Sequence, residues 1–213
     1  MLRLAIILVG FVWATFAQAA ATSPLVDVPW IKQNGTGDGR VIVDLRSRRA
    51  YLGAHIPGAV HSDYGRDGWR VRVKGVAGLF PPDDKSLKRL TTVIGKLGID
   101  NSSHVVLVAP GYSAGDMGMA TRIYWTFKVL GHDTVSILDG GMAAYLGERV
   151  ADNGTPLNPL QPGPVPVAAK QFIPHIRTEM LIGRAEVEQS LKRGVGIVDA
   201  RSNVQYIGLN KSG

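Results

Sequence analysis

The 213-residue sequence contains no cysteine. This absence excludes a disulfide framework, a thiolate zinc or iron-sulfur site and a cysteine nucleophile within these residues. Acidic residues are also few, because 17 Asp and Glu accompany 24 Lys and Arg and leave a net charge of +7. A basic balance favours anionic partners in general, among them nucleic acid, acidic lipid and small anions, and does not choose among them.

The basic residues are spread along the chain, and the densest group is Arg66, Arg70, Arg72 and Lys74. The last three alternate with valines, which is typical of an exposed strand. Nucleic-acid readers usually carry longer basic runs interleaved with aromatics, and only Trp69 is a neighbour here. We interpret the group as a solvated strand or loop face in preference to a ligand patch, and we expect no nucleic-acid partner.

Only the N-terminus contains a long hydrophobic run. Arg3 gives a short basic head, residues 4–16 are apolar, and Ala17 and Ala19 supply the small residues of a cleavage site. A membrane span needs roughly 20 apolar residues, so a retained anchor is the less favoured alternative. The pattern predicts a signal peptide over residues 1–19 and a periplasmic or secreted mature protein, without stable membrane insertion after cleavage.

A twelve-residue segment occurs twice. Residues 42–53 (IVDLRSRRAYLG) and 197–208 (IVDARSNVQYIG) agree at seven of twelve positions without a gap, at a constant offset of 155. We interpret them as parts of two copies of one domain. Five of the 12 prolines lie within residues 155–166, which predicts an extended connector along the surface. The expected organisation is a signal peptide (1–19), a first domain (24–150), a Pro-rich linker (151–174) and the truncated start of a second domain (175–213).

Strand and helix patterns alternate in the first domain. Helices are expected over 86–97 and 116–130, and the start of the second copy repeats the pattern with a helix over 184–192 and a strand over 195–200. Such alternation predicts an α/β fold, a mostly parallel sheet flanked by helices on both faces. The strands expected in the first domain are residues 41–45, 105–109 and 134–138.

The loop over residues 110–115 leaves one of these strands at its carboxyl end, where ligands of parallel sheets bind. Its backbone N–H groups and the following helix could hold an anion. The alternative is an ordinary glycine-rich connection, because Asp116 could itself cap the positive end of the helix. Ser113 in this loop has no evident base partner, which argues against a serine nucleophile.

Spaced motifs follow one another along the first domain. They are VDLR (43–46), Tyr51, Gly53, HIPGA (55–59), RIYW (122–125), GHD (131–133) and LDGG (138–141). Together they resemble the N-terminal domain of the rhodanese family of tandem-domain sulfurtransferases, over residues 41–145 and again at 197–208.

The resemblance implies a rhodanese-like fold and a sulfurtransferase without a cofactor. In this family a cysteine of the C-terminal domain takes sulfur from thiosulfate or 3-mercaptopyruvate and passes it from a persulfide to cyanide or a thiol, while the N-terminal domain is a non-catalytic copy.

The resemblance also sets expectations for the site. The offset of 155 places the corresponding loop of the second copy, and its cysteine, near position 264, beyond Gly213. We therefore expect a C-terminally truncated chain that is inactive alone, with a poorly ordered second-domain fragment and no catalytic residue of its own.

Arg201 and Gln205 are the candidate substrate-binding residues, since the repeat strand of the family ends near the active site. Gln205 stands where the family often has an arginine, which puts the substrate class in doubt. For Arg201 a structural ion pair is the stronger alternative, because Arg46 stands beside Asp44 at the equivalent place in the first copy.

Other readings stay open. The five histidines show no metal-ligand spacing, so no metal is expected. The main alternative function is a non-catalytic rhodanese-like module that binds an anion or a partner. A phosphatase-like use of the same fold would also need a loop cysteine.

Overall fold

The computed structural model describes residues 22–74, 76–81, 83–147 and 155–210. The predicted signal peptide, residues 1–19, lies outside the described residues. Within the described part, no helix has the length and apolar character needed to cross a membrane.

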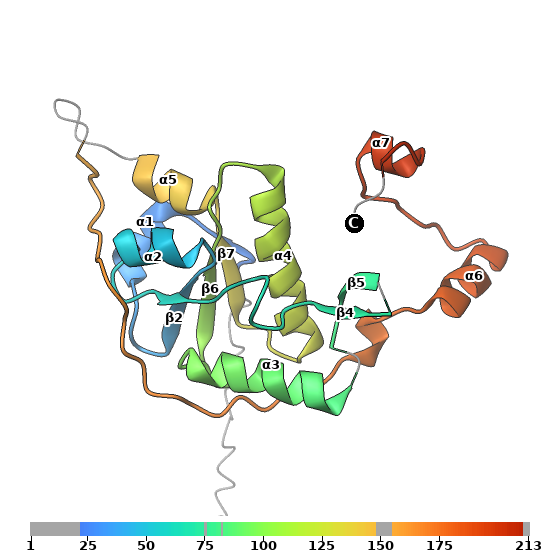
Figure 1. Cartoon of the computed structure of the whole chain (residues 1–213), viewed down its shortest axis with the longest axis horizontal. Helices are drawn as coiled ribbons and strands as arrows, with labels where there is room; N and C mark the ends of the chain where they lie inside the picture. Colours follow the sequence, from blue (N-terminus) through green and yellow to red (C-terminus); the bar gives the residue numbers. More distant parts are fainter. Residues whose placement is uncertain (1–21, 75, 82, 148–154, 211–213) are drawn as a thin grey trace, which may run out of the picture.

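A five-stranded parallel sheet forms the centre of the molecule, in the order β1-β7-β6-β2-β3 (Figure 1). The central strands β2 and β6 pair over five residues, from Arg40 opposite His104 to Asp44 opposite Val108. A separate antiparallel pair, β4 with β5, carries the exposed strand expected around Arg72. The mostly parallel sheet is therefore confirmed. The strands are β1 (Leu25–Val26), β2 (Arg40–Asp44), β3 (Val60–His61), β4 (Val71–Val73), β5 (Val76–Leu79), β6 (His104–Val108) and β7 (Val135–Leu138).

Helices cover both faces of the sheet, as predicted. Alternating side chains of β6 show this, because Val105 and Leu107 pack with α3 and α4 while Val106 and Val108 pack with α1 and α5. The helices are α1 (Val28–Asn34), α2 (Arg48–Gly53), α3 (Asp84–Lys96), α4 (Ala114–Val129) and α5 (Gly141–Gly147). The result is a three-layer α/β domain with a core on each side of its sheet.

The segment after residue 154 runs along this domain as an extended chain (Figure 1). Its backbone is fastened by hydrogen bonds between Gln161 and His55, and from Lys170 N–H to the carbonyl of Gly95. Phe172 is buried in the core formed by α3 and α4. The Pro-rich segment is thus packed against the first domain along its length.

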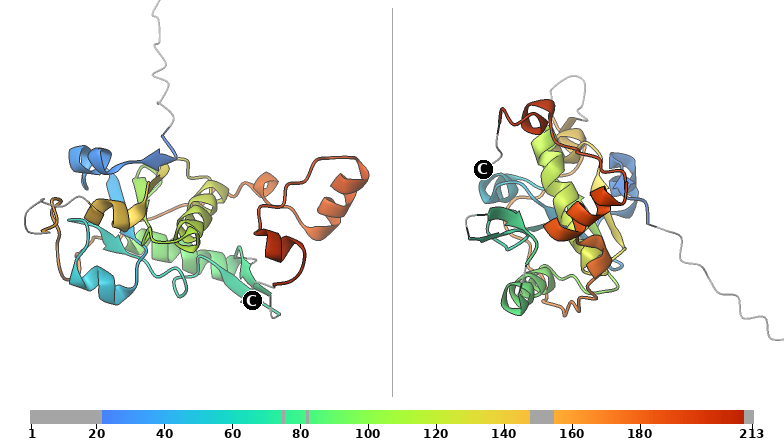
Figure 2. Two further views of the ribbon diagram at one scale, coloured as in Figure 1. Left: turned by 90° about the horizontal axis from the view of Figure 1, so that it is seen from above. Right: turned by 90° about the vertical axis from the view of Figure 1, so that its right-hand side faces the viewer.

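The residues after this segment form η1 (Thr178–Met180), α6 (Arg184–Lys192) and α7 (Asn203–Tyr206). The predicted helix over 184–192 coincides with α6. The predicted strand over 195–200 was wrong, since this segment has no regular secondary structure and Val198 is 91% exposed. A strand requires a neighbour that supplies ladder hydrogen bonds, and α6, α7 and the segment between them lie away from the sheet (Figures 1 and 2).

Candidate functional site

The carboxyl edge of the sheet is the place where a ligand is expected, because parallel strands end there and helices begin. Three connections meet at this edge. They are the turn from β2 into α2, the loop from β6 into α4, and the turn from β7 into α5. We refer to them together as the carboxyl-edge site.

The loop from β6 into α4 is closed by its own side chains. The Asp116 carboxylate accepts hydrogen bonds from the backbone N–H of Tyr112 (3.0 Å) and of Ser113 (3.1 Å). The Ser113 hydroxyl in turn accepts one from the N–H of Asp116 (3.2 Å). This reciprocal cap occupies the N–H groups of Tyr112, Ser113 and Asp116 and places a negative charge at the positive end of the helix. Of the two readings of this loop, the structure supports the self-capped connection.

Glycines bring the neighbouring turn against this loop. Gly111 has φ +88° and Gly141 has φ +59°, both in the left-handed region that glycine tolerates. A Cβ on Gly111 would collide with the carbonyl of Gly140, and one on Gly141 with the carbonyl of Ala109. The LDGG motif therefore serves a tight strand-to-helix turn that fills the space beside the loop.

Arg46, in the turn after β2, donates hydrogen bonds to Asp44 and to a backbone carbonyl. Its Nε and Nη2 grip the Asp44 carboxylate at 3.0 and 2.7 Å, and Nη2 also donates to the carbonyl of Ala54 (2.6 Å). The Asp44 and Arg46 side chains are only 2% and 11% exposed. This pair locks the turn and commits the Nε and Nη2 edge of Arg46 to structural contacts.

The two predicted substrate-binding residues lie in the exposed segment around α7. Arg201 grips Asp199 through Nε and Nη2 (2.9 and 2.6 Å), which lowers the pKa of Asp199 to about 2. Gln205 accepts hydrogen bonds through its side-chain oxygen from the N–H and hydroxyl of Ser202. Among the described residues, neither side chain contacts the first domain through a hydrogen bond or ion pair. Their role in substrate binding stays a prediction.

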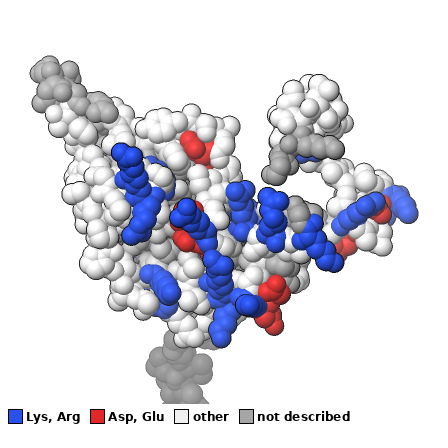
Figure 3. Space-filling model, viewed as in Figure 1, with Lys and Arg blue, Asp and Glu red and all other residues white. Residues whose placement is uncertain are grey.

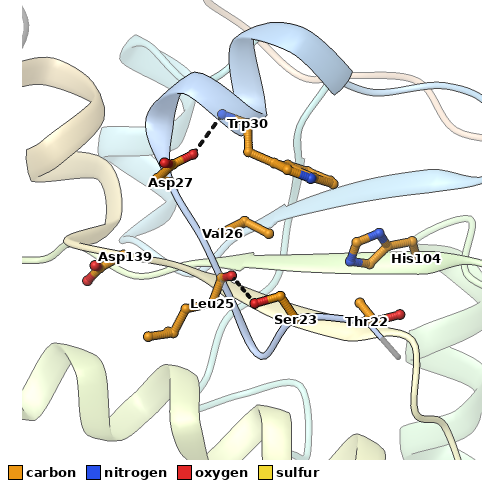
Figure 4. A pocket seen from close by; sticks show the side chains of 8 residues that line it. All are labelled: Thr22, Ser23, Leu25, Val26, Asp27, Trp30, His104 and Asp139. Carbon is orange, nitrogen blue, oxygen red and sulfur yellow. Dashed lines mark hydrogen bonds between the residues drawn. The ribbon is translucent and has the colours of Figure 1, made fainter. Parts of the chain in front are cut away.

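A cavity of about 510 Å³ lies beside the edge strand β1 (Figure 4). Asp27 and Asp139 line one end, and Trp30 and His104 line the other. The His104 ring donates to or accepts from the Ser136 hydroxyl (2.9 Å), and burial lowers its pKa. Two carboxylates without a lining Lys or Arg make this cavity unsuited to an anionic sulfur donor.

Hydrogen bonds place three further histidines in structural roles. His55 contacts the carbonyl of Tyr51, His61 that of Arg46, and His132 that of Thr134. Within the described ranges, no cluster of three or more His, Asp or Glu side chains could hold a metal ion.

One side chain was missed by sequence reasoning. Arg122, in the RIYW motif, lies half-buried on α4 with guanidinium nitrogens that no described residue accepts from. In the sequence, the available signal was that Arg122 directly precedes Ile123, a residue of the core. Both residues belong to α4, a helix with little amphipathic character. Helical periodicity could not show that the guanidinium points inward.

Comparison with known proteins gives concordant matches. The family described as "Rhodanese-like domain" matches residues 27–148. Thiosulfate sulfurtransferase of Bos taurus is 28% identical over 199 residues, which are 86% of this chain and 61% of that protein. The 3-mercaptopyruvate sulfurtransferase of Homo sapiens is 27% identical over 165 residues, 76% of this chain and 50% of that protein. The chain thus spans between half and three-fifths of the length of these curated relatives.

Solved structures show the same fold. SseA from Escherichia coli, described as a 3-mercaptopyruvate sulfotransferase with the rhodanese fold, aligns with a TM-score of 0.61 at 21% identity, over 81% of this chain and 64% of that one. The Tum1 protein from Saccharomyces cerevisiae aligns with a TM-score of 0.62 at 17% identity, over 88% of this chain and 64% of that one.

Proposed function

This chain belongs to the rhodanese-like domain family, and from that premise we propose that it forms the non-catalytic first domain of an exported sulfurtransferase that acts on thiosulfate or 3-mercaptopyruvate. The observation that carries the non-catalytic role is the closed carboxyl-edge site. Asp116 occupies the loop N–H groups of Tyr112 and Ser113, and the loop contains no cysteine. A loop in this state offers no thiolate, and the Asp116 carboxylate holds two of the N–H groups that could stabilise one.

The proposed reaction needs a thiolate from outside these 213 residues. The thiolate attacks the outer sulfur of thiosulfate, the bond between the two sulfur atoms breaks, and sulfite leaves with the electron pair. The resulting persulfide gives its terminal sulfur to cyanide, which forms thiocyanate and regenerates the thiolate. The repeat at residues 197–208 supports a second domain as the source of this cysteine.

An activity assay tests the assignment. The purified 213-residue chain should form no thiocyanate from thiosulfate and cyanide. The protein encoded by the complete gene should form it, and it should carry a cysteine near position 264. Turnover by the 213-residue chain would overturn the cysteine-dependent mechanism, and an inactive complete protein would overturn the proposed activity.

Export is a separate part of the proposal and rests on the basic head, apolar run and small residues of positions 1–19. N-terminal sequencing of the protein recovered from its host should begin at Ala20, in the periplasmic or secreted fraction. An intact Met1 in the cytoplasmic fraction would contradict it.

A second candidate function is a non-catalytic binding module. It is favoured by the packing of the first domain, whose core is completed by Phe172 of the connecting segment. This reading predicts a gene that ends near Gly213 and a product that captures a defined anion or partner. The assay of the complete gene product distinguishes the two functions.

A further inference from the structure

The guanidinium edge of Arg122 is covered by its surroundings and donates a hydrogen bond to no described residue, so an anion reaches it only when the covering side chains move aside. Its Nε and Nη2 atoms are buried and have no hydrogen-bond acceptor among the described residues. The face of the group stacks on the Trp125 ring at 4.8 Å from the ring centre. Stacking occupies the face and leaves the N–H groups of the edge directed within the plane.

The same edge is used elsewhere in this molecule to hold two oxygens. Arg46 grips Asp44, and Arg201 grips Asp199, each through Nε and Nη2. Two parallel N–H donors match the spacing of the oxygens in a carboxylate or a sulfur oxyanion. Arg122 therefore has the donor geometry of these two pairs without their carboxylate.

A second arginine adds to the positive charge at this place. Burial lowers the pKa of Arg122, and the charge of Arg70 lowers it further, while Tyr64 acts in the opposite direction. The Arg70 guanidinium lies over the Tyr64 ring at 4.8 Å. No ion pair of Arg70 or Arg122 is found in the described part of the chain. A partly buried cation that lacks an opposite charge is costly, so an anion would be strongly favoured there.

The surroundings would strengthen such an interaction. Phe80 packs edge-on against Trp125, with ring centres 5.9 Å apart, and Tyr64 and Phe80 both pack against the core. Aromatic walls lower the local dielectric constant and raise the strength of a charge pair. Lys and Arg side chains populate the face seen in Figure 3 and would attract an anion from solution. Arg66, Arg72 and Lys74, which are close to Arg70 in the sequence, are exposed.

We propose that Arg122 and Arg70 form a binding site for a single oxyanion group, a carboxylate or a sulfur oxyanion, which the Nε and Nη2 edge of Arg122 holds through two parallel hydrogen bonds. The group can come from a free anion or from the side chain of an acidic residue. The inference does not rest on the proposed function, because it requires no sulfur transfer.

The test follows the Nε–H resonance of Arg122 by NMR in the 213-residue chain. Sodium thiosulfate, sodium sulfate and sodium acetate are titrated separately against sodium chloride at equal ionic strength. We expect a saturable shift of this resonance with a dissociation constant of about 1 mM, typical of one small charged group. Saturation by thiosulfate and sulfate assigns the site to free sulfur oxyanions, whereas saturation by acetate alone assigns it to a carboxylate side chain.

Substitutions separate the contribution of the two parallel hydrogen bonds from that of the positive charge. Arg122→Lys keeps the charge and removes the bidentate edge, so anion binding, followed for this variant through the indole N–H resonance of Trp125, should weaken about tenfold. Arg70→Gln changes an exposed side chain and should weaken it about threefold. Arg49→Gln, an exposed arginine of α2, is the matched control and should leave binding unchanged.

Two outcomes would overturn the proposal. One is the absence of saturation by any of the three anions in the unaltered chain. The other is an equal response of the unaltered chain and Arg70→Gln, which would reveal general ionic screening. Both outcomes can be measured on the unaltered chain and on Arg70→Gln, even where the Arg122→Lys variant fails to fold.

Discussion

The two copies of the repeated segment share their local geometry and differ in everything around it. In residues 40–53 and 195–208 alike, an arginine grips the aspartate two positions earlier, and a serine precedes a short helix. In the first copy the preceding residues form β2, between β6 and β3. In the second copy the same Ile-Val-Asp sequence forms no strand.

This comparison separates short-range from long-range determinants. The Asp-x-Arg grip closes within three residues, so it forms with or without a sheet. A strand depends on partners from distant parts of the chain, because its hydrogen bonds and burial both come from neighbours. Ile42 is accordingly 0% exposed and Ile197 is 51% exposed.

Substitution of Ile42 and of Ile197 should show the largest difference in unfolding free energy. Ile42→Ala opens a cavity in the core and should cost about 4 kcal/mol of unfolding free energy, whereas Ile197→Ala should change it by less than about 0.5 kcal/mol. Urea denaturation followed by circular dichroism measures both. A similar loss in the two variants would show that residues 195–200 are packed in solution.

Substitution of Asp44 and of Asp199 should give the second-largest difference in stability. Asp44→Ala leaves the buried Arg46 guanidinium without its partner and should cost about 3 kcal/mol. Asp199→Ala removes an exposed carboxylate, and we expect no measurable change in stability. The same denaturation series checks both variants, and a small effect of Asp44→Ala would show that Arg46 can reach solvent when released.

The tyrosine pair should give a smaller difference. The buried Tyr51 hydroxyl donates to the carbonyl of Ala59 (2.9 Å) and accepts from the N–H of Val165 (3.2 Å). Tyr51→Phe should therefore cost about 1 kcal/mol, and the exposed Tyr206→Phe should be neutral. Hydrogen exchange of the Val165 N–H gives a second readout, since only Tyr51→Phe should raise its exchange rate.

A change of pH should give the smallest difference between the first domain and the second copy of the repeat. Burial lowers the pKa of His104 and of His132, so below pH 6.5 the unfolded chain binds protons that the folded first domain resists. The histidine contribution to the stability of that domain should be fully present above pH 6.5 and should be lost as the pH falls through the lowered folded-state pKa values, and His132→Gln should reduce this dependence. The Asp199–Arg201 pair should persist until the pH falls toward about 2, as NMR titration of the Asp199 carboxyl can show. Loss of that pair near pH 5 would contradict the lowered pKa of Asp199.

Much of the fold could be predicted from local patterns. The strands β2, β6 and β7 and the helices α3, α4 and α6 occur within two residues of their expected bounds, because apolar periodicity and capping residues such as Asp83 act over short distances. The two-residue strands β1 and β3 carry too little periodicity to be recognised. Their assignment to the sheet depends on pairing with β7 and β2.

The candidate site was less accessible to sequence reasoning. The self-capping of the loop by Asp116 could be anticipated, because the cap joins residues three positions apart. The burial of Arg122 Nε and Nη2 and the charge interaction of Arg122 with Arg70 could not, since the two residues are 52 positions apart in the sequence and interact only in the folded chain.

The sequence by itself determined the absence of a thiol, the repeated Asp-x-Arg segment and the alternation of strands and helices, because these depend on residue identity and short-range spacing. Only the tertiary structure decided which Ile-Val-Asp copy becomes a strand, how Phe172 closes the core and that two Arg122 nitrogens are buried without an acceptor among the described residues. The physical reason is that burial and pairing are properties of distant neighbours, which local spacing does not specify.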